Sequence, residues 1–428
     1  MNNRYSYLAE HIIGSEIIRI AAEINKKIRE GSKIYNLTIG DFDPKLFPIP
    51  EKLRDFIVQA YVSDSTNYPP ADGIPALREA VARLTSERQG MKYNADEILI
   101  ACGARPVIYS IFRTLVDKDD NVLYAVPSWN NNHYTFLHFA KGIEIHTKPE
   151  HHFMPSADDI LPHISDIQLL ALCSPQNPTG TMFSEEGLKK ICLAVLEENQ
   201  KRTQNGKRPL YVMYDQIYSE LVYGDNKHYN PVVLFPEMRD YTVFVDGISK
   251  SLAATGVRVG WGIGPKSMID KMKSILTHIG AWAPRPEQEA TANYLSSLDD
   301  YNAFLEKRKQ EIFSRLTKIY EGFKDLKNKG FPVDCIEPQG AIYLTVRFNV
   351  KGYRTKEGKN LQSTEDITNY LLNEAHIGLV PFYAFGAPKE SEWYRISVGT
   401  LKHEDIPEIF KALENALRSL HAPTKAGV

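Results

Sequence analysis

Residues 244–258 read FVDGISKSLAATGVR, and the rest of the chain can be interpreted outward from this stretch. It begins as an aromatic and β-branched run, which is typical of a strand, and the run breaks at Gly247. Lys250 follows among small and apolar residues, where loss of hydration disfavours its charged form and lowers its pKa. A neutral amine can attack an aldehyde, so the stretch predicts a Schiff-base lysine. The alternative is a surface lysine and a core-edge Arg258 on either side of a turn.

Composition excludes several classes of protein. The chain has 428 residues, which is too long for one small core and indicates two or more domains. The formal net charge of -2 argues against a nucleic-acid partner, because such partners require a basic stripe. No apolar run approaches the length of a membrane span, and the N-terminus lacks the apolar segment of a signal peptide. We therefore expect neither a nucleic-acid nor a membrane partner.

Cysteine usage bears on metals and on location. The four cysteines are far apart and form no CxxC pair: Cys102, Cys173, Cys192 and Cys335. This spacing argues against a zinc site and against a disulfide framework. The sequence therefore predicts no metal site and a reducing, cytoplasmic location.

Short apolar runs alternate with helical patterns through the middle of the chain. The runs have strand length and lie at residues 98–102, 122–126, 143–147, 169–173, 210–214, 242–245 and 259–263. Helical patterns between them cover about 106–116, 131–140 and 184–204. The alternation predicts an α/β fold with a mainly parallel sheet flanked by helices. Ligands of such sheets lie beyond the carboxyl ends of the strands.

The pattern changes near residue 300, which divides the chain into predicted domains. Charged helical patterns fill 286–330, and strands then follow at longer intervals before a closing helix at 403–420. We predict an N-terminal arm over 1–50 that forms part of the small domain, a large domain over 51–299, and a smaller α+β domain over 300–428. Within the arm, apolar residues with a helical period predict a helix over 11–30 that ends at Gly31.

Three turns that follow predicted strands carry residues suited to chemistry. Gly103-Ala104-Arg105 opens a helix, where small residues let N–H groups approach an anion. The turn at 174–180 reads SPQNPTG, a rigid and shaped sequence. Asp215 ends a buried strand, where a carboxylate requires a partner. The alternatives are a helix N-cap for Asp215 and a core position for Tyr218.

In this order the residues resemble the fold-type I, class I and II aminotransferases that use pyridoxal phosphate (PLP). The resemblance runs from about Leu37 to Gly399 and rests on Tyr68, Gly103-Ala104-Arg105, Trp129, Asn177-Pro178-x-Gly180, Asp215-x-x-Tyr218, Ser249-Lys250, Arg258 and Arg395. It implies the PLP-dependent transferase fold, with a large domain and a smaller α+β domain. It also implies transfer of an amino group from an α-amino acid to a 2-oxo acid by a ping-pong mechanism.

The resemblance assigns the coenzyme ring to five residues. Lys250 would hold the coenzyme covalently and move a proton at the substrate α-carbon. Asp215 would pair with the pyridine nitrogen, and Tyr218 and Asn177 with the 3′ oxygen of the ring. Trp129 resembles the aromatic residue stacked on the ring, with a core tryptophan as the alternative.

The resemblance assigns the phosphate to Arg258, Ser249 and the N–H groups near Gly103, Ala104 and Arg105. Tyr68 resembles a tyrosine that reaches the phosphate of the neighbouring subunit, which implies a homodimer with shared active sites.

The substrate α-carboxylate is assigned to a third group of residues. Arg395 lies in an apolar strand, where a buried arginine needs an anionic partner. In the family this partner is the substrate α-carboxylate, and Gly40 and Asn177 resemble the residues that assist. Arg105 stands where some relatives read a second substrate carboxylate and others bind the phosphate. Pro106 biases Arg105 toward extended conformations, so both interpretations stay open.

Other functions compete with the aminotransferase. PLP lyases and synthases, C–S β-lyase-like or aminocyclopropane-carboxylate-synthase-like, use the same lysine, so this alternative stays open. The near-neutral charge and the absence of an N-terminal DNA-binding segment argue against a PLP-sensing regulator. The run Gly260-Trp261-Gly262-Ile263-Gly264 has the wrong glycine spacing for a nucleotide-dependent dehydrogenase.

Overall fold

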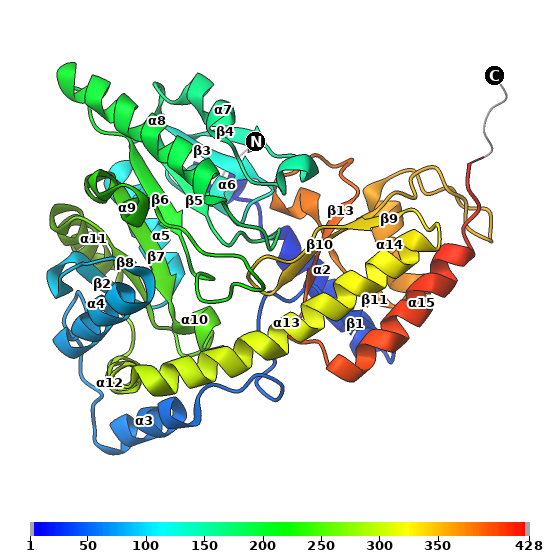
Figure 1. The fold of residues 1–428 in the computed structure, drawn as a ribbon, viewed down its shortest axis with the longest axis horizontal. Helices are drawn as coiled ribbons and strands as arrows, with labels where there is room; N and C mark the ends of the chain where they lie inside the picture. Colours follow the sequence, from blue (N-terminus) through cyan, green and yellow to red (C-terminus); the bar gives the residue numbers. More distant parts are fainter. Residues whose placement is uncertain (1–3, 424–428) are drawn as a thin grey trace.

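The computed structural model describes residues 4–423, so the outermost ends of the predicted segments 1–50 and 300–428 lie outside the described residues. Within that range a seven-stranded sheet and a four-stranded sheet organise two parts of the molecule (Figure 1). None of the helices in this range is both long and apolar enough to cross a lipid bilayer.

The larger sheet has the strand order β2-β8-β7-β6-β5-β3-β4. Its strands are β2 (Ile98–Ala101), β3 (Asn121–Val126), β4 (Lys141–His146), β5 (Ile167–Cys173), β6 (Tyr211–Asp215), β7 (Thr242–Gly247) and β8 (Gly260–Ile263). The pairs from β4 to β7 are parallel, whereas β8 runs antiparallel to both of its neighbours. The prediction of a mainly parallel sheet is confirmed.

Alternate side chains of this sheet enter two separate apolar cores, one on each face. In β7, Val243 and Val245 belong to one core and Phe244 belongs to the other. Helices α5 (Ala104–Leu115) and α11 (Lys266–Ile279) contribute to the first core, and α4 (Pro75–Gln89) and α8 (Glu185–Gln204) to the second. Burial on both faces explains why the strands read as continuous apolar runs.

The smaller sheet is antiparallel and has the order β12-β13-β10-β9. It contains β9 (Val333–Cys335), β10 (Tyr343–Phe348), β12 (Val380–Pro381) and β13 (Trp393–Ser397), with α14 (Thr364–Glu374) and α15 (Ile406–Arg418) nearby. The arm joins this part because β1 (Tyr35–Asn36) pairs in parallel with β11 (Ile377–Gly378). Helix α13 (Leu298–Asn328) runs unbroken from the large part to the small part (Figure 1). The predicted boundary at residues 299 and 300 therefore falls in the first turn of a helix.

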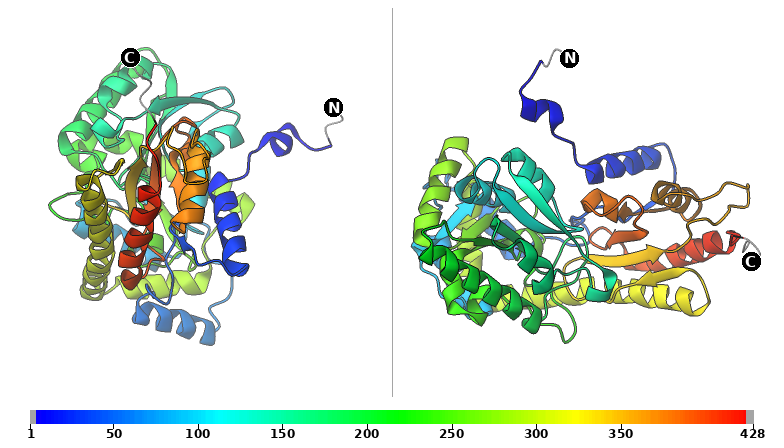
Figure 2. Two further views of the ribbon diagram at one scale, coloured as in Figure 1. Left: turned by 90° about the vertical axis from the view of Figure 1, so that its right-hand side faces the viewer. Right: turned by 90° about the horizontal axis from the view of Figure 1, so that it is seen from above.

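The N-terminal arm differs from its prediction. The helix expected over 11–30 is present but begins later, as α2 (Glu16–Arg29), and a separate short helix, α1 (Tyr7–His11), precedes it. The chain is extended at Ile12 and at the N-cap Ser15, which flank Gly14, a residue that disfavours helix. Helix α1 projects from the body of the molecule (Figure 2) and contacts it through Tyr7, whose ring centroid lies 6.5 Å from that of Phe136. The remaining helices are α3 (Glu51–Val62), α6 (Asn131–Leu137), α7 (Ala157–Ile160), α9 (Pro231–Leu234), α10 (Ile248–Ser251) and α12 (Arg285–Leu295).

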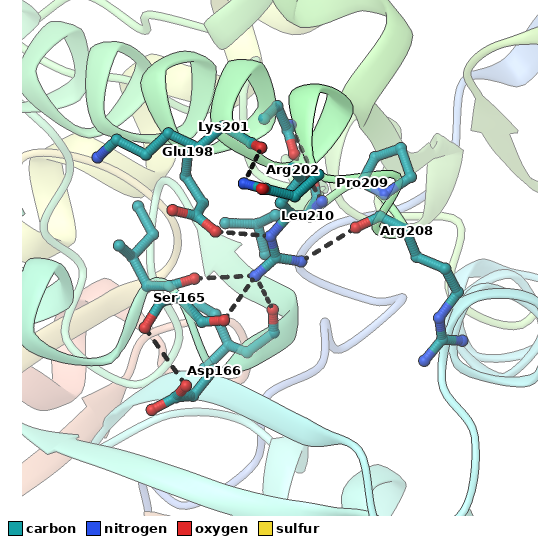
Figure 3. A network of polar contacts seen from close by, with 12 residues as sticks. Ser165, Asp166, Glu198, Lys201, Arg202, Arg208, Pro209 and Leu210 are labelled. Carbon is teal, nitrogen blue, oxygen red and sulfur yellow. Dashed lines mark hydrogen bonds and ion pairs between the residues drawn. The ribbon is translucent and has the colours of Figure 1, made fainter.

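A buried arginine joins the end of α8 to the start of β5 (Figure 3). Arg202 is 5% exposed, and its Nε donates to Glu198 Oε1 at 2.8 Å. Its other N–H groups donate to backbone carbonyls of Ile164, Ser165, Ile167 and Arg208. Because these acceptors lie just before and at the start of β5 and in the segment between α8 and β6, the guanidinium fixes how α8 packs on the sheet.

We expect Arg202→Met to destabilise the protein by about 3–5 kcal/mol, because it leaves the Glu198 carboxylate buried without its partner. The matched control is Arg208→Met. Arg208 pairs with Asp117 and Asp120, but its side chain is 53% exposed, so this change should cost less than about 1 kcal/mol. The midpoints of thermal unfolding measure both effects, and equal shifts would contradict the assignment.

Candidate active site

A cavity of about 620 Å³ lies where the carboxyl ends of the parallel strands meet the arm and the smaller sheet. The residues that follow or end β2, β5, β6 and β7 all contribute to its wall. Eleven sequence-predicted residues line it: Gly40, Ala104, Arg105, Trp129, Asn177, Asp215, Tyr218, Ser249, Lys250, Arg258 and Arg395. The structure thus brings together residues that are spread over most of the chain.

Lys250 lies in α10, the single helical turn that follows β7. Its Nζ donates to the carbonyl oxygen of Gly40 at 2.8 Å. Desolvation lowers the pKa of Lys250 to about 8, and the charges of three arginines act in the same direction, against an opposing effect of Asp41. These arginines are Arg395, Arg105 and Arg258. The amine is therefore substantially neutral near pH 8, as the sequence analysis expected of this lysine.

Asp215 ends β6 and faces the same cavity. Its Oδ1 accepts the N–H of Ile217 at 3.1 Å. Desolvation raises the pKa of Asp215 to about 6, against lowering by the Ile217 hydrogen bond and the Lys250 charge. The chain continues after Asp215 as turns and not as a helix, so the alternative of a helix N-cap is wrong.

Arg395 is 1% exposed and lies on β13, an inner strand of the smaller sheet. Its Nη1 donates to Asn177 Oδ1 at 3.0 Å, and its Nη2 donates to the Thr38 carbonyl at 2.6 Å. The guanidinium lies 4.5 Å from the ring centroid of Tyr343. Neither partner is an anion, and burial lowers the pKa of Arg395. A buried cation with neutral partners at a cavity wall is suited to an incoming carboxylate.

At the opposite wall Arg258 lies against the start of α5. Its Nη1 donates to the Thr255 carbonyl at 2.7 Å, and its Nη2 donates to the Cys102 carbonyl at 3.1 Å. Gly103 is the N-cap of α5 with φ 85°, and a Cβ there would collide with the Arg258 guanidinium. A glycine is therefore required at this turn. Ser249 is buried and lines the same cavity.

Arg105 and Trp129 lie together in the cavity wall. The Arg105 guanidinium is 4.8 Å from the Trp129 ring centroid, a cation–π contact. Arg105 lies within the first turn of α5, so the expected bias toward an extended conformation is wrong here. Pro106 is tolerated at that position because the N–H groups of a first helical turn have no partner within the helix.

Tyr218 and the missed residues complete the wall. Tyr218 is 2% exposed, and its hydroxyl lies 2.6 Å from the Tyr343 hydroxyl. The cavity wall also contains Asp41, Thr255 and Cys173, as well as Ser15, Ile17 and Ile18 near the start of α2. Sequence reasoning singled out none of these six for the site. Local signals existed for three of them, because Asp41 follows Gly40, Cys173 precedes the 174–180 turn and Thr255 lies in the 244–258 stretch.

Tyr68 does not reach this cavity within one chain. Its side chain is 82% exposed and packs edge-on against Trp282, with ring centroids 5.6 Å apart. Gly103 also stands just behind the cavity wall, beneath Arg258.

Comparison with known proteins agrees with this geometry. The sequence profile of the family described as Aminotransferase class I and II matches residues 32–413. An aspartate aminotransferase from Geobacillus stearothermophilus is 28% identical over 408 residues, which cover 93% of this chain and 94% of the relative. A probable aspartate/prephenate aminotransferase from Rickettsia felis is 28% identical over 410 residues, with coverages of 94% and 93%.

Solved structures of aminotransferases have the same fold. The aspartate aminotransferase from Rhizobium meliloti superposes with a TM-score of 0.88 at 26% identity, covering 98% of this chain and 100% of that structure. The aspartate aminotransferase from Thermus thermophilus has the same fold, with a TM-score of 0.85 at 24% identity and coverages of 97% and 100%. The family is PLP-dependent in general. The chain belongs to the aminotransferase class I and II family and is an enzyme that transfers amino groups.

Proposed function

We propose that this aminotransferase binds PLP through Lys250 and moves an amino group from an α-amino acid to a 2-oxo acid by a ping-pong mechanism. The observation that carries the proposal is Lys250 itself, a lysine whose pKa is lowered to about 8 inside a cavity. Lys250 lies in the same cavity wall as the Asp215 carboxylate at the end of β6 and the Arg105 guanidinium at the start of α5.

The cavity wall offers groups suited to each part of PLP: its phosphate, its ring nitrogen and its ring face. The guanidinium of Arg258, the Ser249 hydroxyl and the N-terminus of α5 at Gly103 are donors suited to a phosphate. Asp215 is an acceptor suited to a protonated ring nitrogen, and Trp129 offers an aromatic face. Tyr218 offers a hydroxyl next to Asn177 in the same wall.

When bound, PLP supplies an aldehyde and an electron-withdrawing ring that accepts the electron pair released at the substrate α-carbon. Lys250 would act as the acid and base, taking the proton from the substrate α-carbon and delivering it to C4′ of the coenzyme, and carrying it back in the second half-reaction. Its pKa of about 8 suits this role, because both protonation states are populated near neutral pH. Asp215, with a pKa of about 6, is mostly ionised at pH 7 and can accept a hydrogen bond from a cationic ring.

Arg395 binds the substrate α-carboxylate in this proposal. Its position next to Asn177 and close to Gly40 matches the role implied by the family resemblance. A Cβ on Gly40 would lie 2.8 Å from the Tyr343 hydroxyl and 3.5 Å from Arg395 Nη1. Glycine there keeps the guanidinium open to the ligand.

We also propose that the preferred substrate carries a second carboxylate, which Arg105 reads. Relatives named aspartate aminotransferase and aspartate/prephenate aminotransferase support a dicarboxylic substrate. Arg105 lines the cavity, and its planar guanidinium has no carboxylate partner among the described residues. The phosphate already has Arg258.

Arg105→Ala is expected to raise KM for aspartate and glutamate by about 10–100-fold, because a charge-assisted contact is lost. KM for alanine and phenylalanine, and affinity for PLP, should change little. Arg105→Lys is the matched control: it keeps the charge without the planar fork and should show an intermediate loss. Equal losses for every donor, or a loss of PLP affinity alone, would rule out this role.

The proposal includes a homodimer with shared active sites. Tyr68 and the apolar side chains of Val58 and Val62 on α3 are strongly exposed. Contacts of Tyr61 with Glu287 and of Tyr68 with Trp282 make α3, the following loop and the start of α12 one surface. Contiguous exposed apolar side chains of this kind mark an interface. Tyr68 would then reach the phosphate of the neighbouring subunit.

A cytoplasmic location is also part of the proposal. None of the four cysteines forms a disulfide in the structure. Cys192 is buried, and the other three are half-buried. Free thiols are the usual state in a reducing compartment.

A donor screen separates the proposed reaction from the lyase and synthase alternative. The PLP-loaded enzyme is mixed with each amino acid and 2-oxoglutarate, and glutamate formation is measured. We expect glutamate to form with at least one donor, aspartate first. Release of pyruvate or ammonia without glutamate would identify the lyase chemistry instead.

A further inference from the structure

The arm meets the lysine loop directly beside Lys250. The Lys250 amine donates to the carbonyl of Gly40, and the next residue, Asp41, lines the same cavity. Asp41 Oδ1 accepts from the Thr255 hydroxyl at 2.6 Å and from the N–H of Phe42 at 2.7 Å. Two hydrogen bonds therefore join residues 40–41 to the loop that contains Lys250 and Thr255.

The charge balance of the cavity makes Asp41 unusual. The proposed reaction brings a phosphate and a substrate carboxylate into this cavity, and both would be repelled by another carboxylate. The cations of the wall are Lys250, Arg105, Arg258 and Arg395. Asp215 is the other carboxylate, and the proposed function already gives it a partner. Burying a second carboxylate there costs free energy unless a cation compensates its charge.

The cation bonded to the residue before Asp41 is Lys250, whose Nζ donates to the Gly40 carbonyl. The charge of Asp41 raises the pKa of Lys250, second in size only to the lowering by desolvation, and opposes the three arginines. Asp215 also interacts electrostatically with the amine, while the rings of Tyr218 and Phe42 lie 5.6 Å and 6.0 Å from Nζ. Asp41 is thus a carboxylate held in place by hydrogen bonds, and its charge opposes the effect of the three arginines on the pKa of Lys250.

We propose that Asp41 is a positioning residue, whose carboxylate, held by Thr255, is the counter-charge that keeps the Lys250 ammonium beside Gly40. The inference rests on the proposed role of Lys250 as the coenzyme lysine. That lysine has to be neutral when it attacks an aldehyde and protonated when it returns a proton to substrate. Without Asp41, burial and the arginines would hold the amine too far toward its neutral form.

The test measures the titration of Lys250 in the full-length protein freed of coenzyme. Trace acetylation with acetic anhydride is followed between pH 6 and pH 10, and the peptide that contains Lys250 is quantified by mass spectrometry. Asp41→Asn keeps an oxygen that accepts from Thr255 and Phe42 but removes the charge. We expect its Lys250 midpoint to fall by roughly one pH unit, the usual effect of losing one nearby opposite charge.

Two further variants make the result decisive. Asp43→Asn is the matched control, because Asp43 is two residues away and bonds the N–H of Lys45 outside the cavity wall; its midpoint should equal that of the unmodified protein. Asp41→Glu keeps the charge, so its Lys250 midpoint should stay close to that of the unmodified protein. The proposal is overturned if Asp41→Asn titrates like the unmodified protein, or if Asp41→Glu falls as far as Asp41→Asn.

The result is separable from the proposed function. Borohydride reduction of the PLP-loaded enzyme asks whether Lys250 carries the coenzyme, whereas the titration asks what sets the charge of its amine. A failure of the first would leave the titration unaffected, and a failure of the second would leave the coenzyme lysine in place.

Discussion

Lys250→Ala is expected to abolish the covalent bond between protein and PLP and to lower turnover by at least about 10²–10⁴-fold, the usual contribution of a positioned acid and base. The physical reason is that the cavity wall offers one amine at this place, between Asp215 and Arg258. PLP itself should still bind, because its phosphate and ring partners remain. Borohydride reduction followed by peptide mapping measures the bond, and steady-state kinetics measure the turnover.

The matched control is Lys266→Ala, which removes an exposed lysine at the start of α11. That variant should keep both the reducible bond and normal turnover. Labelling of a lysine other than Lys250 in the unmodified enzyme would refute the assignment, as would a reducible bond that persists in Lys250→Ala.

Asp215→Asn is expected to reduce turnover by about 10²–10³-fold, the loss typical of one preorganised charge at a reacting centre. The variant keeps the size of the side chain and an oxygen that can accept the N–H of Ile217. It loses the negative charge that would face the ring nitrogen. A cationic ring nitrogen beside Asp215 would lower its pKa below the value of about 6 found without that partner, so turnover of the unmodified enzyme should fall only as the pH drops well below 6. The variant should lack that dependence.

Stability provides the control for this second variant. If Asp215 served only the local turn, its replacement would change the thermal midpoint and leave turnover nearly intact. We expect the opposite, with a small change in stability and a large change in rate. Asp240→Asn, at an exposed position between β6 and β7, should change neither. Near-normal turnover of Asp215→Asn would contradict the pairing with the ring.

The sheet and most of the site could be predicted because both depend on short-range patterns. Apolar runs of strand length alternate with helical patterns, and the parallel sheet follows from that alternation. Residues at the carboxyl ends of neighbouring parallel strands meet at one edge of the sheet. Asp215 and Lys250 therefore had to lie near one another once β6 and β7 were recognised as adjacent parallel strands.

Contacts across the smaller sheet and the arm could not be predicted in this way. The Thr255 hydroxyl bonds Asp41, 214 residues earlier in the chain, and the Tyr218 hydroxyl bonds Tyr343, 125 residues later. No local pattern encodes either pair, because each depends on how the arm and the smaller sheet pack against the strand ends. The same holds for Ile17, whose helical period predicted packing but not the cavity that it borders.

By itself, the sequence determined the chemistry: a lysine in a small-residue turn, an acid at a strand end, and arginines at two other turns. Those identities limit the reaction whatever the detailed packing, because only certain side chains carry the required charges and protons. The sequence predicted that the pKa of Lys250 is lowered, but tertiary structure decided by how much, since the charges of Asp41, Arg105 and Arg395 come from segments far from Lys250 in the chain. Desolvation and Coulomb interactions act through space and not along the chain, and space is defined only once the segments have packed.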